Sequence, residues 1–147
     1  DKGIEDFSKA RPIEPNNASI HYNLGMSYLG KDEYSKAIEH FDEAIKIGPE
    51  SEYDIAYFSR GIAYLNKDEI DKAIQDFSTA ISLDGEFALA YFWRGNANSS
   101  LGEIAKAIQD YSTAISLNPD YALAYNNRIK EIIPSPQLLF KIYIPLN

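Results

Sequence analysis

The chain has 147 residues, of which 45% are hydrophobic and 24% charged, so it can bury a core and has the balance of a globular rather than a disordered protein. Its net charge of −8 argues against a nucleic-acid partner, because phosphate binding needs a basic stripe and the sequence shows none. The chain has no cysteine, which excludes disulfides, thiolate metal sites and cysteine nucleophiles and favours a cytoplasmic location.

The chain opens with a segment, residues 1–10, that recurs in variant form at 35–47, 71–83 and 105–117. Apolar residues recur in these copies at the three- and four-residue spacing that predicts helix. Pro12 follows the first copy and is expected to end its helix early, because a proline inside a helix costs about 3 kcal/mol. The three later copies share an alanine and, four residues on, an aromatic residue: Ala37 and Phe41, Ala73 and Phe77, Ala107 and Tyr111.

A second motif precedes each of the later copies and ends in a glycine: Tyr22-Asn23-Leu24-Gly25, Phe58-Ser59-Arg60-Gly61 and Phe92-Trp93-Arg94-Gly95. Turn residues, including Gly30, Asp68 and Gly102, stand between the two motifs, so each unit is predicted to be a pair of helices. The glycine and the alanine are expected to let the two helices approach closely, with the aromatic residue filling the adjacent space. The first unit is two residues longer than the second, and the extra residues are expected in the polar loop 50–53.

The pattern His21-x-x-Leu24-Gly25-x-x-Tyr28, followed by Ala37, Phe41 and Pro49, resembles the tetratricopeptide repeat. The resemblance implies an all-α, right-handed superhelical solenoid of antiparallel helix pairs. It covers residues 1–133, and a chain that opens within a unit is expected to belong to a longer array. The predicted parts are a second-helix half repeat (1–17), three full repeats (18–53, 54–87, 88–121), a first-helix half repeat (122–133) and an apolar tail (134–147).

Arg60 and Arg94 stand where the repeat normally has leucine, and each of their units has an aspartate 16 residues later, Asp76 or Asp110. We therefore predict a partly buried ion pair within each of these two hairpins. The alternative is that the third unit simply descends from the second. The first unit has Leu24 and His40 at these places, and we interpret His40 as part of a solvated helix face.

The resemblance further implies that ligands lie in a concave groove lined by the first helix of each unit. The residues expected to bind a partner there are Tyr22, Met26, Ile55, Phe58, Ile62, Leu89, Phe92, Trp93, Asn96 and Asn126. Asn127 and Lys130 hold further positions of the same groove. This apolar, aromatic surface with amide edges predicts a protein–protein interaction scaffold that binds an apolar or amphipathic peptide or helix. The alternative is that the aromatic residues are ordinary core.

Co-chaperones of this family hold the C-terminal carboxylate of heat-shock chaperones with two lysines, two asparagines and an arginine, spread over three units. The matching residues in units one to three are Tyr22, Met26, Ser59, Leu89 and Trp93. Starting one unit later gives Phe58, Ile62, Trp93, Leu123 and Asn127. Neither frame contains the set, so binding of a chaperone tail by this mechanism is not expected.

No catalytic or metal-binding pattern is present in the sequence, so no enzyme and no cofactor are expected. No apolar run approaches the ~20 residues that a membrane span needs. Two rival functions remain, namely homo-association through the terminal half repeats or the tail, and docking for a larger enzyme. The tail, 134–147, is expected to cover the last helix or to contact a partner chain; the alternatives are a disordered tail and head-to-tail pairing of the terminal half repeats.

Overall fold

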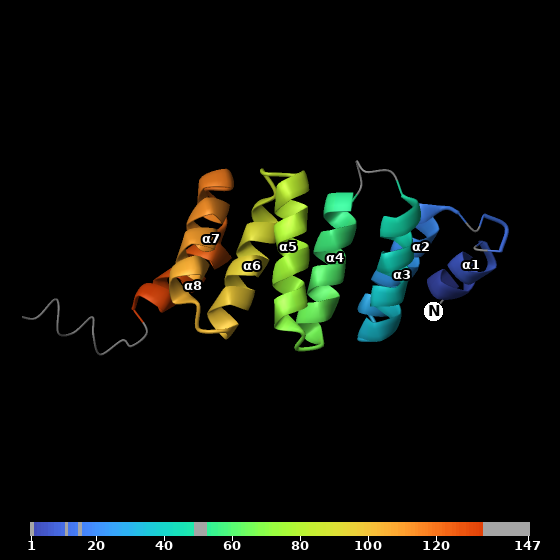
Figure 1. The fold of residues 1–147 in the computed structure, drawn as a ribbon, viewed down its shortest axis with the longest axis horizontal. Coiled ribbons are helices and arrows are strands. Elements are labelled where there is room, and N and C mark those ends of the chain that lie inside the picture. Colours follow the sequence, from blue (N-terminus) through green and yellow to red (C-terminus); the bar gives the residue numbers. More distant parts are fainter. Residues whose placement is uncertain (1, 11, 15, 49–52, 134–147) are drawn as a thin grey trace, which may run out of the picture. The chain divides into compact units, whose positions relative to one another are not determined.

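The computed structural model describes residues 2–10, 12–14, 16–48 and 53–133, so the predicted tail and its roles lie outside the described residues. The described residues form eight α-helices and no strand (Figure 1). This confirms the predicted all-α class. The helices are α1 (Lys2–Ala10), α2 (Ala18–Leu29), α3 (Tyr34–Ile47), α4 (Tyr53–Asn66), α5 (Ile70–Leu83), α6 (Ala88–Ser100), α7 (Ile104–Leu117) and α8 (Ala122–Ile132).

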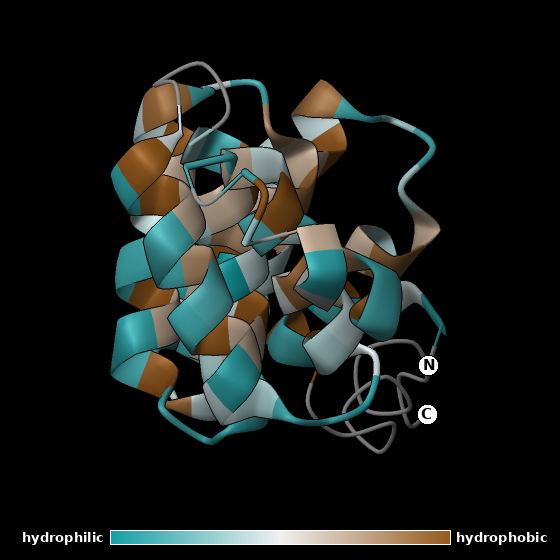
Figure 2. Cartoon of the chain, turned by 90° about the vertical axis from the view of Figure 1, so that its right-hand side faces the viewer, coloured by the Kyte–Doolittle hydropathy of each residue, from teal (hydrophilic) through white to brown (hydrophobic). Residues whose placement is uncertain are grey.

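The chain forms two compact units, Asp1–Gly85 with α1 to α5 and Glu86–Asn147 with α6 to α8. From this point the first and second unit are these two parts of the chain, and each helix pair of the repeat is called a hairpin. In the first unit, α2 packs against α3 and α4 against α5, while α3 also contacts α4 and α1 contacts α2. In the second unit, α7 lies against both α6 and α8. Figure 2 shows hydrophobic and hydrophilic residues interspersed along the helices, as expected for helices that bury one side only. Helix α1 ends at Ala10, before Pro12, as the sequence predicts.

A glycine facing an aromatic ring sets the spacing of each hairpin. A Cβ atom added to Gly25 would lie 2.6 Å from the ring of Phe41, and one added to Gly61 would lie 2.7 Å from Phe77. In the second unit, a Cβ on Gly95 would lie 2.7 Å from the ring of Tyr111. The aromatic residues of all three pairs are buried. The predicted close approach of the helices is therefore confirmed.

The turns between paired helices use left-handed backbone conformations. Asp32 and Asp68 have φ values of 60° and 62°, and Gly102 has a φ of 75°. Only glycine adopts this conformation without steric cost, whereas aspartate is one of the residues that tolerate it. The turn signals in the sequence thus mark the places where the chain reverses.

We expect Gly102→Ala to lower the free energy of unfolding by about 1 kcal/mol, because alanine resists the left-handed conformation. No heavy atom lies within 4 Å of a Cβ built at Gly102, so the effect isolates the backbone. Gly85→Ala is the matched control, since Gly85 has equally open surroundings and no positive φ. Urea titration of both variants measures the difference, and equal stabilities would contradict the explanation.

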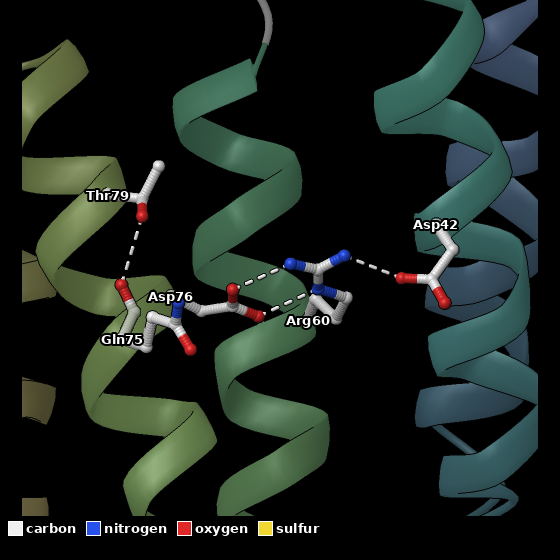
Figure 3. A network of polar contacts seen from close by, with 5 residues as sticks. All are labelled: Asp42, Arg60, Gln75, Asp76 and Thr79. Atoms are coloured by element: carbon white, nitrogen blue, oxygen red, sulfur yellow. Dashed lines mark hydrogen bonds and ion pairs between the residues drawn. The ribbon is translucent and has the colours of Figure 1, made fainter.

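The predicted ion pair of the second hairpin is present (Figure 3). Arg60 Nε and Nη2 donate to the two carboxylate oxygens of Asp76 at 2.8 and 2.7 Å. The side chains of Arg60 and Asp76 are 18% and 5% exposed. Arg60 Nη1 also donates to Asp42 on α3 at 2.6 Å, so one guanidinium links both hairpins of the first unit. Burial alone would lower the pKa of Arg60, but its bonds to Asp76 and Asp42 outweigh this and raise the pKa above its usual value.

The third hairpin repeats this arrangement in the second unit. Arg94 Nε and Nη2 donate to the carboxylate of Asp110 at 3.0 and 2.7 Å. Asn98 donates a further hydrogen bond to Asp110 at 3.1 Å and is itself buried. Both ion pairs predicted from the sequence are therefore confirmed as partly buried, bidentate contacts.

The interpretation of His40 as part of a solvated helix face is wrong. Its imidazole is half-buried, stacks on the ring of Tyr28 with centroids 5.4 Å apart, and places Nδ1 3.4 Å from Nδ1 of the buried His21. The reason is that Leu24 occupies the arginine position of this hairpin. The other two hairpins have an aspartate, Asp76 or Asp110, at the position of His40. Because this hairpin has no guanidinium for an aspartate to bind, the His40 ring packs against its neighbours instead.

Candidate functional site

The predicted binding residues of the first unit lie on its two first helices, α2 and α4. Met26 and Ile55 are 42% and 46% exposed, although both are apolar. Tyr22, Phe58 and Ile62 are half-buried. Large apolar side chains that remain this accessible on a folded surface are candidates for contact with another molecule.

Core residues hold the two aromatic residues among these, Tyr22 and Phe58, in place. The ring of Tyr22 lies 5.8 Å from that of the buried Phe41, and the ring of Phe58 lies 5.8 Å from that of the buried Phe77. The Tyr22 hydroxyl also lies within hydrogen-bond distance, 3.3 Å, of Ser59 Oγ on α4. The inner edges of the rings are thus fixed by the core, while part of each side chain remains accessible.

An apolar hollow of about 120 Å³ opens beside Tyr22 and Ile55, which the structure brings together from α2 and α4. Its other lining residues are Ala18, Ser19, Ala44, Gly48, Tyr53 and Ala56. Tyr53 donates its hydroxyl proton to the carbonyl of Gly48 at 2.8 Å, which fixes one wall. Sequence reasoning missed Ala44 and Gly48, which belong to the second helix α3 and its C-cap, because the groove positions lie on the first helices. It also missed Tyr53, the first residue of α4, which precedes the groove positions of that helix.

Met26 lies apart from this hollow. It lines a second recess of about 310 Å³ together with Ser27, Gly30 and Lys31 of α2 and its turn, and Gly3 and Ile4 of α1. The structure therefore places Tyr22 and Ile55 at one recess and Met26 at another, while Phe58 and Ile62 line neither of the two.

The predicted residues of the second unit differ widely in exposure. Leu89 is 46% exposed and Trp93 is half-buried, whereas Phe92 is only 5% exposed. The ring of Phe92 lies 5.9 Å from Tyr111 and 4.8 Å from Tyr121, the residue before α8. Phe92 is therefore a core residue of the second unit, as the alternative interpretation of the aromatic residues has it.

Asn96 belongs to a polar network between α6 and α8. Its Oδ1 accepts hydrogen bonds from the Tyr111 hydroxyl at 2.9 Å and from Asn127 Nδ2 at 2.8 Å. These residues line a polar recess of about 280 Å³ with Ser99, Ser100, Lys130 and Glu131. Burial, and then the charge of Glu131, raise the pKa of Tyr111, so its hydroxyl stays a proton donor at neutral pH. Asn126 is exposed and does not line this recess.

Neither a metal site nor a membrane span appears in the described part of the chain. No group of three or more histidine, cysteine, aspartate or glutamate side chains there is placed to hold a metal ion. No helix within 2–10, 16–48 or 53–133 has the length and hydropathy needed to cross a bilayer.

The profile of the tetratricopeptide repeat family matches residues 18–51, 55–87 and 88–121, more than half of the chain. The chain belongs to the tetratricopeptide repeat family. This agrees with the helical hairpins, the glycine–aromatic contacts and the turn positions described above.

Three relatives place this tetratricopeptide repeat chain among known proteins. Human mitochondrial import receptor subunit TOM70 is 36% identical over 47 residues, which are 32% of this chain but only 8% of that protein. The crystal structure of MamA is 30% identical, with a TM-score of 0.81 over 87% of this chain and 74% of its own. The second tetratricopeptide repeat domain of human RPAP3, in complex with an HSP70 peptide, is 26% identical, with a TM-score of 0.72 over 80% and 99%. Family and neighbours together support a protein-interaction scaffold.

A third frame of the co-chaperone pattern begins at the third tetratricopeptide repeat. There Asn96 and Asn127 hold the two asparagine positions, and the structure brings them into hydrogen-bond contact. The first lysine position is occupied by the buried Phe92. The signal was present in the sequence, since both asparagines hold groove positions of the repeat.

Proposed function

We propose that the first unit binds an apolar or amphipathic segment of another protein, with one apolar side chain of that segment in the hollow beside Tyr22 and Ile55. The observation that carries the proposal is the hollow itself, which is apolar and opens next to an isoleucine that is 46% exposed. None of its described lining residues is a lysine or arginine, so these residues supply no positive charge to hold an acidic tail.

Binding should depend on Ile55 and hardly on salt. Truncating a central apolar anchor typically costs about 2 kcal/mol of binding free energy, roughly a 30-fold loss of affinity. We expect a loss of this size for Ile55→Ala, with little change in stability, because about half of the side chain is already in water. Leu83→Ala is the matched control, since Leu83 is 48% exposed in the same unit but lies on the second helix α5.

The experiment begins with affinity capture of partners by the wild-type chain and both variants, quantified by mass spectrometry. Recovered partners are then titrated directly at low and high salt. Equal affinities of the Ile55→Ala and Leu83→Ala variants would contradict the proposal. A steep fall of affinity with salt would also contradict it, because exposed charges are screened and apolar contacts are not.

Homo-association is the rival that the same apolar surface allows. Sedimentation at several concentrations separates the two functions: a monomer at all concentrations favours a foreign ligand. Concentration-dependent association that Ile55→Ala abolishes would favour homo-association instead.

A further inference from the structure

Helix α8 carries a third arginine, Arg128, at the position that Arg60 and Arg94 hold in their helices. The guanidinium of Arg128 lies over the ring of Tyr125, three residues earlier, at 5.5 Å from its centroid. Arg60 lies over Tyr57, also three residues earlier, at 5.1 Å. The local setting of the arginine is thus the same on α8 as on α4.

The contact to the preceding helix is also reproduced. Arg128 Nη1 donates to Ser112 Oγ on α7 at 3.1 Å, just as Arg60 Nη1 donates to a side chain of the preceding helix α3. What differs is the following helix, which supplies Asp76 to Arg60. Among the residues that the structure describes, no carboxylate forms an ion pair with Arg128. Its Nε and second terminal nitrogen are the donors that a bidentate carboxylate would engage.

The apolar residues around Arg128 point to the same missing partner. Tyr125, Ile129 and Ile132 lie on one side of α8, at helical spacing, and are 37%, 53% and 57% exposed. Ile129 and Ile132 correspond to Gly95 and Asn98 on α6. Those two residues are buried, and α7 packs against α6. The face of α8 therefore has the composition of a surface that a further helix covers.

Ile129 restricts which helix can fit. It stands in the place of Gly95, where an added Cβ would already lie 2.7 Å from the ring of Tyr111. A partner that presents an aspartate followed by an aromatic residue would collide with Ile129. Three described helices of this chain have an aspartate at the position of Asp76 in the repeat. In each of them an aromatic residue follows it: Asp6-Phe7, Asp76-Phe77 and Asp110-Tyr111. The segment 134–147 contains no aspartate or glutamate, so it offers no side-chain carboxylate to Arg128.

We propose that the face of α8 formed by Tyr125, Arg128, Ile129 and Ile132 docks an amphipathic helix of another protein. That helix presents an aspartate to Arg128 and a small residue immediately after it, opposite Ile129. It packs on α8 as α7 packs on α6. This docking surface is distinct from the hollow beside Tyr22 and takes an acidic helix rather than an apolar segment.

The test uses a synthetic peptide with the sequence of α7, residues 104–118, carrying Tyr111→Ala. Its control carries Asp110→Asn in addition, which keeps the shape and removes the charge. Both peptides are titrated into the full chain by fluorescence anisotropy. We expect the aspartate peptide to bind at least about tenfold more tightly, because a carboxylate matched to a guanidinium forms two charge-assisted bonds. Arg128→Gln in the chain should abolish this difference, whereas Lys130→Gln, an equal change of charge on the same helix, should preserve it.

A size exchange tests the role of Ile129. In an Ile129→Gly chain the preference should reverse, so that the peptide with the natural Tyr111 binds more tightly than the Tyr111→Ala peptide. Circular dichroism confirms that α8 remains folded in each variant. Absence of binding, equal affinity of the aspartate and asparagine peptides, or a difference that survives Arg128→Gln would overturn the proposal. So would binding that appears only after removal of residues 134–147, or self-association of the chain that Arg128→Gln abolishes, since the tail or a second copy would then be the occupant.

Discussion

Replacing Asp76 with alanine is expected to lower the free energy of unfolding by about 3 kcal/mol or more. The substitution removes the acceptor of two hydrogen bonds and leaves Arg60, 18% exposed, without its main counter-charge. A charge that loses its partner in a partly buried place keeps the cost of desolvation and loses the compensating attraction. Chemical denaturation of the variant measures the loss.

The same arginine supplies the control. Asp42 also pairs with Arg60, but its side chain is 49% exposed, so Asp42→Ala should cost under about 1 kcal/mol. Comparing the stability losses of Asp76→Ala and Asp42→Ala isolates the effect of carboxylate burial, because Arg60 is the cation in both pairs (Figure 3). If the two variants lose equal stability, burial does not set the strength of this network. Arg60→Leu/Asp76→Ala should recover part of the loss, because the unpaired charge is then absent.

Phe92→Ala is expected to lower the free energy of unfolding by about 3–5 kcal/mol, the usual range for removing a buried phenylalanine. Phe92 is 5% exposed and contacts Trp93, Tyr111 and Tyr121, so the substitution opens a cavity inside the second unit. A binding defect in this variant would therefore arise from lost structure. Thermal and urea unfolding of the variant measure the effect.

Leu89→Ala is the matched control on the same helix, since Leu89 is 46% exposed and its truncation should change stability by about 0.5 kcal/mol or less. A Phe92→Ala variant as stable as Leu89→Ala would show that Phe92 is not a core residue. In that case the original interpretation of Phe92 as a binding residue would stand.

The aromatic residues Tyr22, Phe58 and Phe92 open the same motif in their repeats but do not share one role. Tyr121 covers Phe92 in the second unit, at a ring distance of 4.8 Å. Tyr53, the first residue of α4, holds the equivalent position, yet its hydroxyl is bonded to the carbonyl of Gly48, and both residues line the hollow beside Tyr22. The two extra residues predicted within the loop 50–53 lie, apart from Tyr53 itself, outside the described residues.

The sequence by itself determined the helical hairpins, because glycine, alanine and aromatic residues at fixed spacing describe contacts within one pair of helices. It also determined the ion pairs of Arg60 and Arg94, since each aspartate lies 16 residues away on the neighbouring helix. Local spacing suffices where both partners belong to the same repeating element.

Only the tertiary structure decided which groove residues remain accessible. Periodicity assigns a residue to one side of its own helix, but the exposure of that side depends on residues from other helices. The burial of Phe92 depends on Tyr121, the hollow beside Ile55 depends on Gly48 and Tyr53, and the polar recess depends on the meeting of Asn96 with Asn127. These partners lie 29 residues away for Phe92, 7 and 2 for Ile55, and 31 for Asn96. No single spacing relates them, so packing alone reveals them.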